Sequence, residues 1–328
     1  MAAKPSLCSD LIDLFGSVMA RRRYLMMSDL PESTTTQFTP ARPKLWRWIL
    51  GTLIILFSWL VIGGILYSIV ASVFDLDLQI LDGADEADRE ILRSYQPWQA
   101  ASPLLVSFLP LLFVPLLLHR YLLKWPLRSI FTRSNQSFSR EVRIGASVMT
   151  LILIVATLLD FLFFKTSYTW SFDAARFLPY LLVALILIPI QTTAEEVFYR
   201  GWIQQRLENG RRSIWLVSFV SGLLFALPHM SNPEVNGEFI LPIIGYGSMG
   251  FMFTWVTLRY NSMGLAIGAH AMNNIWVGLL VSSTDSALTS ASLLVTSEIE
   301  WVSEAAGSVL IVPLFIWLTG KWKGKVTP

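Results

Sequence analysis

Cysteine and histidine are scarce in this chain, which has one cysteine and three histidines among 328 residues. A single thiol cannot close an intramolecular disulfide or build a thiolate metal centre, so the sequence excludes both of these scaffolds. Charge is scarce as well, because only 15% of the residues are charged and the formal net charge is +2. A chain with so little pooled positive charge is not expected to bind nucleic acid.

Apolar residues make up 54% of the sequence, and its mean hydropathy is +0.55. This composition is typical of a polytopic membrane protein and not of a soluble globular domain. We therefore predict an all-α fold, a bundle of about eight transmembrane helices whose surrounding partner is the lipid bilayer. The expected helices lie near residues 48–74, 99–123, 144–164, 177–207, 214–229, 239–258, 262–281 and 304–318.

Residues 1–44 are predicted to form a cytoplasmic tail, and residues 45–328 the transmembrane domain. Apolar positions in the tail precede the basic cluster at residues 21–23, which is the reverse of the order in a secretory signal. Their spacing predicts a short amphipathic helix on the membrane surface, and a partly disordered tail is the alternative. A linker is expected at residues 28–43, where proline and threonine recur.

Basic and acidic loops alternate along the chain. The loop at residues 75–90 is acidic, whereas lysine and arginine dominate the segments at 21–47, 120–143, 206–212 and 321–325. Under the positive-inside rule, this alternation predicts that both termini are cytoplasmic. The lack of long segments outside the predicted helices favours a multi-pass protein of the bacterial cytoplasmic membrane.

Glu195 and Glu196 lie inside an apolar run and are followed by Arg200. A carboxylate at membrane depth costs about 2.5 to 3.5 kcal/mol, so an adjacent pair of them indicates a functional site. Glu196 and Arg200 are four residues apart and share one helical face, which predicts an ion pair between them. Glu195 is turned ~100° away from that face and is expected to remain unpaired.

Two further polar pairs occur in apolar segments downstream. Phe225 and His229 are four residues apart, as are His270 and Asn274, so each pair lies on one face of a helix. The polar turn after Glu195 predicts an antiparallel hairpin, in which Glu195 and His229 lie roughly 21 and 27 Å from the turn at ~1.5 Å per residue. The carboxylate and the imidazole are therefore expected at similar depth.

The three patterns EExxxR, FxxxH and HxxxN occur in this order on successive predicted helices. In this combination the chain resembles the CPBP family of intramembrane proteases, which includes the CAAX prenyl endopeptidases and the bacterial Abi proteins. The resemblance covers residues 177–281, the expected protease-like core. It implies hydrolysis of a membrane-associated peptide or protein by residues of the three motifs.

Peptide hydrolysis within a membrane needs an activated water, a proton shuttle and donors for the developing oxyanion. We assign Glu195 as the general base and His229 as the group that holds the water or carries the proton. His270 and Asn274 would donate hydrogen bonds to the tetrahedral intermediate. Three residues are expected to support them by pairing and packing: Glu196, Arg200 and Phe225.

A zinc ion is the alternative to a metal-free mechanism. Glu195, His229 and His270 would form a set of two histidines and one carboxylate that leaves a coordination position for water. The sequence lacks HExxH, the usual metalloprotease motif on one helix. We therefore favour a mechanism without a cofactor.

Two functions without proteolysis remain open. A proton-coupled transporter would use Glu195 and His270 as a relay, but the sequence has no paired repeats or matching interrupted helices. A scaffold or bacteriocin-immunity protein of the same family would keep the motifs without cleaving a substrate. A network that only joins helices accounts for His229 and Asn274, but not for a second buried carboxylate without a second cation.

Overall fold

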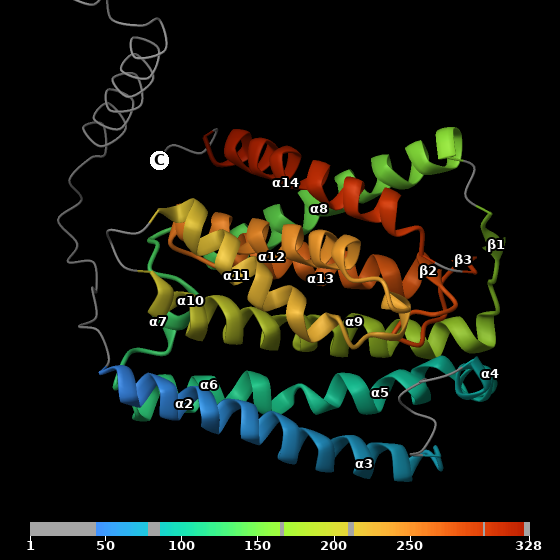
Figure 1. Ribbon diagram of the computed structural model, residues 1–328, viewed down its shortest axis with the longest axis horizontal. Helices are drawn as coiled ribbons and strands as arrows, with labels where there is room; N and C mark the ends of the chain where they lie inside the picture. Colours follow the sequence, from blue (N-terminus) through green and yellow to red (C-terminus); the bar gives the residue numbers. More distant parts are fainter. Residues whose placement is uncertain (1–43, 78–85, 165–166, 209–212, 298, 325–328) are drawn as a thin grey trace, which may run out of the picture. The chain divides into compact units, whose positions relative to one another are not determined.

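A computed structural model describes residues 44–77, 86–164, 167–208, 213–297 and 299–324. The chain divides into two units, residues 1–39 and 40–328, and all described residues belong to the second. The predicted tail, with its amphipathic helix and linker, lies outside the described residues except for position 44. The described part is all-α apart from one small sheet, which confirms the predicted fold class (Figure 1).

All eight predicted segments are helical. Among the described residues, six helices are long and apolar enough to cross a membrane, which agrees with a polytopic membrane protein. The remaining two predicted spans, α11 (Ile214–His229) and α13 (Gly264–Leu279), have 16 residues each. They are shorter than the ~20 residues that usually span the hydrocarbon, so a count of eight crossings remains a prediction.

The first two spans contain interruptions that have local causes. The first runs through α2 (Leu45–Ser58), a π-helical turn (Trp59–Gly63) and α3 (Gly64–Val73). The second is divided at Phe108 into α5 (Pro97–Ser107) and α6 (Leu109–Tyr121). A break is expected there because Pro110 has no N–H to donate to the preceding turn. Between the two spans lies a short helix that was not predicted, α4 (Glu86–Ser94).

Two spans extend beyond their apolar runs. After the short α7 (Arg128–Phe131), α8 (Phe138–Leu159) begins six residues before the predicted start and continues into a π-helical turn (Asp160–Phe164). The last helix, α14 (Trp301–Gly324), is longer than predicted at both ends. Hydropathy marks the part of a helix that fits the hydrocarbon, whereas polar turns continue the same helix into the interface.

The central span is continuous from residue 174 to 207. It consists of α9 (Ala174–Glu196), the π-helical segment η3 (Val197–Ile203) and α10 (Gln204–Leu207). Asp173 caps its start by accepting a hydrogen bond from the backbone N–H of Ala175 at 2.9 Å. In Figure 1, α9 lies between α5 and α6 on one side and α13 on the other, and it contacts all three.

The remaining helices complete the bundle around α12 and α13. The helix α12 (Ile240–Tyr260) packs on α11 and α14, and α13 packs on α8 and α9. The backbones of α8 and α13 approach closely at Gly145 and Gly268, where a Cβ atom would collide with carbonyl oxygens of the facing helix. Small residues allow such close approach between membrane helices. This contact fixes the part of α13 that carries His270.

A small three-stranded sheet connects distant loops. It contains β1 (Thr169–Trp170), β2 (Val281–Ser283) and β3 (Leu294–Thr296) in the order β1-β3-β2. Strand β3 pairs antiparallel with β1 and parallel with β2. We did not predict these strands, because each has only two or three residues and shows no usable alternation.

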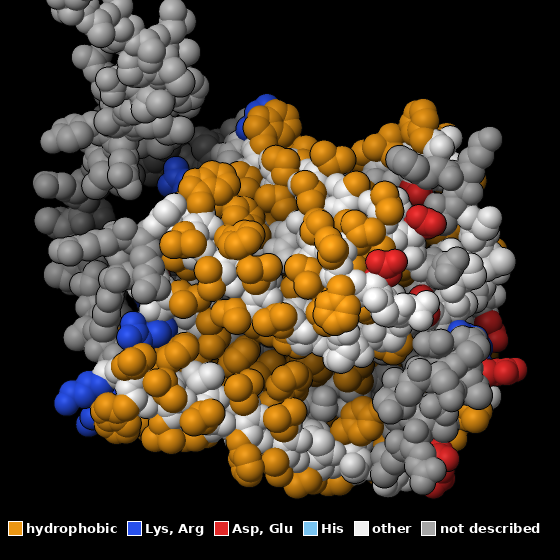
Figure 2. All heavy atoms as spheres, viewed as in Figure 1, with side chains coloured by type: hydrophobic (Ala, Val, Ile, Leu, Met, Phe, Trp, Pro, Cys, Tyr) orange, Lys and Arg blue, Asp and Glu red, His pale blue; other side chains and the backbone are white. Residues whose placement is uncertain are grey.

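The surface of the described residues suits a bilayer. Hydrophobic side chains cover most of the face drawn in Figure 2, and large ones such as Leu60 and Val73 are 69% exposed. Lys and Arg side chains gather near one end of the helices in this view, and Asp and Glu side chains near the other. This separation agrees with the alternation of loop charges, while the orientation of the termini remains a prediction.

Candidate active site

The predicted ion pair between Glu196 and Arg200 is present. Nη1 of Arg200 donates to Oε1 of Glu196 at 3.0 Å, and both side chains are fully buried. Nη2 of Arg200 donates to the backbone carbonyl of Gly250 on α12 at 2.9 Å. The guanidinium therefore neutralises a carboxylate of its own helix and ties that helix to α12.

Arg200 lies in the π-helical segment η3, which the sequence pattern did not predict. Short π-helical segments occur frequently at functional sites because they re-aim side chains within a continuous helix. The guanidinium carbon lies 4.8 Å from the ring centroid of Phe225 and 5.2 Å from that of Phe253. Two aromatic faces thus complete the surroundings of the buried cation.

His270 connects the two carboxylates. Its Nδ1 lies 2.8 Å from Oε1 of Glu196, and its Nε2 lies 3.4 Å from Oε2 of Glu195. The first contact is a hydrogen bond, and the second is within the range of an ion pair. The expectation that Glu195 stays unpaired is therefore wrong. It considered only neighbours on the same helix, whereas α13 packs on α9 and brings an imidazole between the carboxylates.

Packing holds the His270 ring in this position. The ring of Phe253 stacks on it with centroids 4.9 Å apart, and the ring of Phe225 meets it edge-on at 5.7 Å. Phe253 was not among the predicted site residues, because it belongs to α12 and only the tertiary fold brings it to His270. Since both ring nitrogens face carboxylates, rotation of the imidazole would break two polar contacts.

His229 lies at the end of α11, beside Phe225 as predicted. The two rings are 4.7 Å apart, and Nδ1 of His229 is 2.8 Å from the carbonyl oxygen of Phe225. A carbonyl can only accept, so Nδ1 carries a proton, and in the neutral ring Nε2 keeps a lone pair. Tyr246 of α12 stacks on the imidazole at 4.4 Å, and its hydroxyl donates to Glu234 at 2.7 Å. Neither Tyr246 nor Glu234 was predicted.

Asn274 is connected to the carboxylates through Gln191. Its amide Nδ2 donates to Oε1 of Gln191 at 3.4 Å, and its Oδ1 accepts from Asn273 at 3.2 Å. Gln191 precedes Glu195 by four residues on α9, so the two side chains share a helical face. This spacing could have revealed Gln191 from the sequence.

The structure brings most of the predicted residues into one cluster. Pairwise contacts at the distances above link five of them: Glu195, Glu196, Arg200, Phe225 and His270. His229 joins the cluster through Phe225, and Asn274 lies beside it through Gln191.

The alternative zinc set is not assembled. Within the described part of the chain, no three side chains of His, Cys, Asp or Glu converge as a group that could hold a metal ion. His229 directs Nδ1 to a backbone carbonyl, and both nitrogens of His270 face carboxylates. The donor set of Glu195, His229 and His270 therefore does not fit a zinc site in this arrangement.

The segment that contains these residues matches a known protein family. Residues 174–276 match the family model described as type II CAAX prenyl endopeptidase Rce1-like. This segment is similar to the Rce1-like family. It runs from the start of α9 into α13 and contains every predicted catalytic and supporting residue, from Glu195 to Asn274. The resemblance inferred from the three motifs is thus confirmed at the level of the family.

A curated relative of this chain is "Uncharacterized protein YyaK" of Bacillus subtilis (strain 168), with 34% identity over 168 residues. The alignment covers 51% of this chain and 56% of that protein, so the chain spans about half the length of the relative it matches. No solved structure matches the chain.

Proposed function

We propose that this protein is an intramembrane endopeptidase that hydrolyses a peptide bond in a membrane-associated peptide or protein. The observation that carries the proposal is the buried arrangement of Glu195, His270 and Glu196 within an Rce1-like segment. Arg200 neutralises Glu196, so Glu195 and His270 are left as a carboxylate and imidazole that can share one proton. A network that only joins helices has no need for this second carboxylate.

In the proposed mechanism, Glu195 accepts a proton from water as the water oxygen attacks the scissile carbonyl carbon. The π electrons of the carbonyl move to its oxygen. The resulting oxyanion is stabilised by the side-chain amide N–H of Asn274. The hydrogen bond from Asn274 to Gln191 is long, at 3.4 Å, so its redirection to an oxyanion costs little. The C–N bond then breaks, and the proton held by Glu195 passes to the leaving amine.

The geometry favours a revised role for His270. As an oxyanion donor it would need an N–H directed away from the carboxylates, but both nitrogens face them. We assign His270 to share a proton with Glu195, so that Glu195 can be ionised when the water attacks. The lone pair on Nε2 of His229 suits it to orient the water or to carry a proton to the leaving group.

The substrate class follows from the surroundings of the site. The helices that carry it are apolar and expose large hydrophobic side chains, so a substrate must reach the site from the bilayer or its surface. The proposal places the protein in the bacterial cytoplasmic membrane, with a membrane-associated peptide or protein as its partner.

The test is cleavage by purified protein in liposomes, with membrane peptides that accumulate when the gene is deleted as candidate substrates. In water enriched in ¹⁸O, mass spectrometry should detect a new carboxyl terminus that contains ¹⁸O. Glu195→Gln should form no product, whereas the matched control Glu238→Gln, which changes an exposed loop carboxylate, should cleave like the wild type. Equal product from Glu195→Gln and wild type would refute the proposal.

A further inference from the structure

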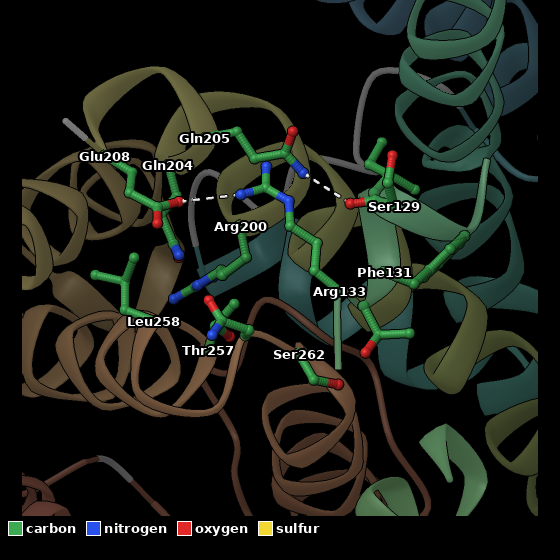
Figure 3. Close-up of a pocket in the computed structure, with 13 residues that line it drawn as sticks. Ser129, Phe131, Arg133, Arg200, Gln204, Gln205, Glu208, Thr257, Leu258 and Ser262 are labelled. Carbon is green, nitrogen blue, oxygen red and sulfur yellow. Dashed lines mark hydrogen bonds and ion pairs between the residues drawn. The ribbon is translucent and has the colours of Figure 1, made fainter. Parts of the chain in front are cut away.

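A polar cavity lies beside Arg200, between α7, α10 and the end of α12 (Figure 3). Its volume is about 30 Å³, and its lining includes Arg200, Gln204, Gln205, Thr257 and Ser262. A cavity of ~10 to 15 Å³ is enough to hold one water molecule if polar partners are available. The cavity is therefore large enough for one or two waters and too small for a peptide side chain of ordinary size.

Three residues that line this cavity each have a buried polar atom without a hydrogen-bond partner among the described residues. These atoms are Nε of Arg200, Oε1 of Gln204 and Oγ1 of Thr257, whose residues are 1%, 3% and 8% exposed. Leaving a buried donor or acceptor unsatisfied costs about 1 to 3 kcal/mol per group. One donor, one acceptor and one hydroxyl that is both match the hydrogen-bonding capacity of water.

The outer rim of the cavity reaches the surface. Arg133 and Glu208 form an ion pair at 3.6 Å there, and their side chains are 26% and 36% exposed. Beside them, the amide of Gln205 donates to the backbone carbonyl of Ser129 at 3.3 Å, as drawn in Figure 3. This polar rim lies on the loop side of the bundle, where water is available.

The inner wall of the cavity belongs to the candidate active site. Arg200 lines the cavity and its Nε has no hydrogen-bond partner among the described residues, whereas Nη1 of the same guanidinium donates to Glu196, which contacts His270. A series of polar groups thus runs from the exposed ion pair through the cavity to the buried carboxylates. The helices around this series are otherwise apolar.

We propose that this cavity binds water and is the route by which water reaches Glu195. The inference rests on the proposed function, because hydrolysis consumes one water for each peptide bond. The water oxygen enters the new carboxyl group, and its two hydrogens end on the acid and amine products. Each turnover therefore requires a replacement water in a site enclosed by apolar helices.

Thiol accessibility to a probe of nearly water size tests the proposal. Cys8 is the sole cysteine, so Cys8→Ser gives a background free of thiols. Thr257→Cys in this background places a thiol at the cavity, and Val256→Cys places one in the adjacent apolar core, where the residue is 0% exposed. Folded protein in liposomes is treated with Ag⁺, and mass spectrometry after unfolding measures how much thiol is protected from alkylation.

The expected result is rapid protection of the thiol in Thr257→Cys and none in Val256→Cys. Bound Ag⁺ should then lower kcat of Thr257→Cys by at least about tenfold with KM changed less than about twofold, because it blocks water and not substrate. If Thr257→Cys does not fold, Gln204→Cys replaces it on the facing wall.

Three results would overturn the proposal. The thiol at the cavity could stay unprotected, it could react no faster than the thiol of Val256→Cys, or its modification could leave kcat unchanged. Failure of the proposed function is distinguishable, because then the parent protein cleaves no substrate. Protection of the thiol would still decide whether the cavity holds water.

Discussion

Replacement of Arg200 by alanine tests the arrangement of charges on which the candidate site depends. Arg200 is 1% exposed and is the ion-pair partner of Glu196 at 3.0 Å. Its other contacts include the carbonyl of Gly250 and the rings of Phe225 and Phe253. Arg200→Ala removes all of these contacts and leaves Glu196 as a buried carboxylate without its cation.

The expected loss of stability is large. Removal of one partner of a buried ion pair costs about 3 to 5 kcal/mol, because the remaining charge stays buried. Since ~1.4 kcal/mol corresponds to a tenfold change in an equilibrium constant, the folded-to-unfolded ratio should fall roughly a hundredfold to several thousandfold. Low expression and a strongly lowered Tm should accompany this change.

The assay is equilibrium unfolding of purified protein in mixed detergent, followed by tryptophan fluorescence. The exposed Arg143 provides a matched control, since Arg143→Ala should change the free energy of unfolding by less than about 0.5 kcal/mol. Adding Glu196→Gln to Arg200→Ala removes the stranded charge and should recover a substantial part of the lost stability. Wild-type stability of Arg200→Ala, or a double variant less stable than Arg200→Ala, would refute the pairing argument.

Three further predictions concern other parts of the site. Tyr246→Phe keeps the ring that stacks on His229 but loses the hydrogen bond to Glu234, so kcat in the peptidase assay should fall less than in Tyr246→Ala. Gly268→Val should destabilise the protein by about 1 to 3 kcal/mol in the same unfolding assay, because its side chain would meet the α8 backbone. Gly307→Val is the control, as nothing lies within 4 Å of a Cβ atom there. Exhaustive chelation should leave cleavage unchanged, and zinc at one ion per chain whose removal stops turnover would contradict the metal-free mechanism.

Interactions within one helix were predictable from the sequence, whereas most interactions between helices were not. Spacing of four residues predicted the contacts of Glu196 with Arg200 and of Phe225 with His229. The bounds of α11 also agree with the prediction, because Ser213 caps one end and the apolar run ends at His229. In each case the information is local to one turn or one segment.

The missed features depend on tertiary packing. His270 meets Glu195, and Phe253 stacks on His270, only because α9, α12 and α13 come together. Tyr246 reaches His229 in the same way, through the packing of α12 on α11. The π-helical segment that contains Arg200 could not be predicted, because the hydrophobic pattern of the sequence does not distinguish a short π-helical segment from an α-helix.

The central claim is that Glu195 activates water, and the pH dependence of single-turnover cleavage tests it most directly. A general base must be ionised to act, so cleavage by wild type should rise with pH as Glu195 loses its proton and should then level off. Glu195→Gln keeps the shape of the side chain but cannot accept the proton. It should bind substrate and cleave none at any pH from acid to alkaline conditions.

A transport relay would behave differently, because glutamine there mimics the protonated state and leaves pH-independent substrate exchange running. Substantial cleavage by folded Glu195→Gln at any pH would contradict the assignment of Glu195 as the base.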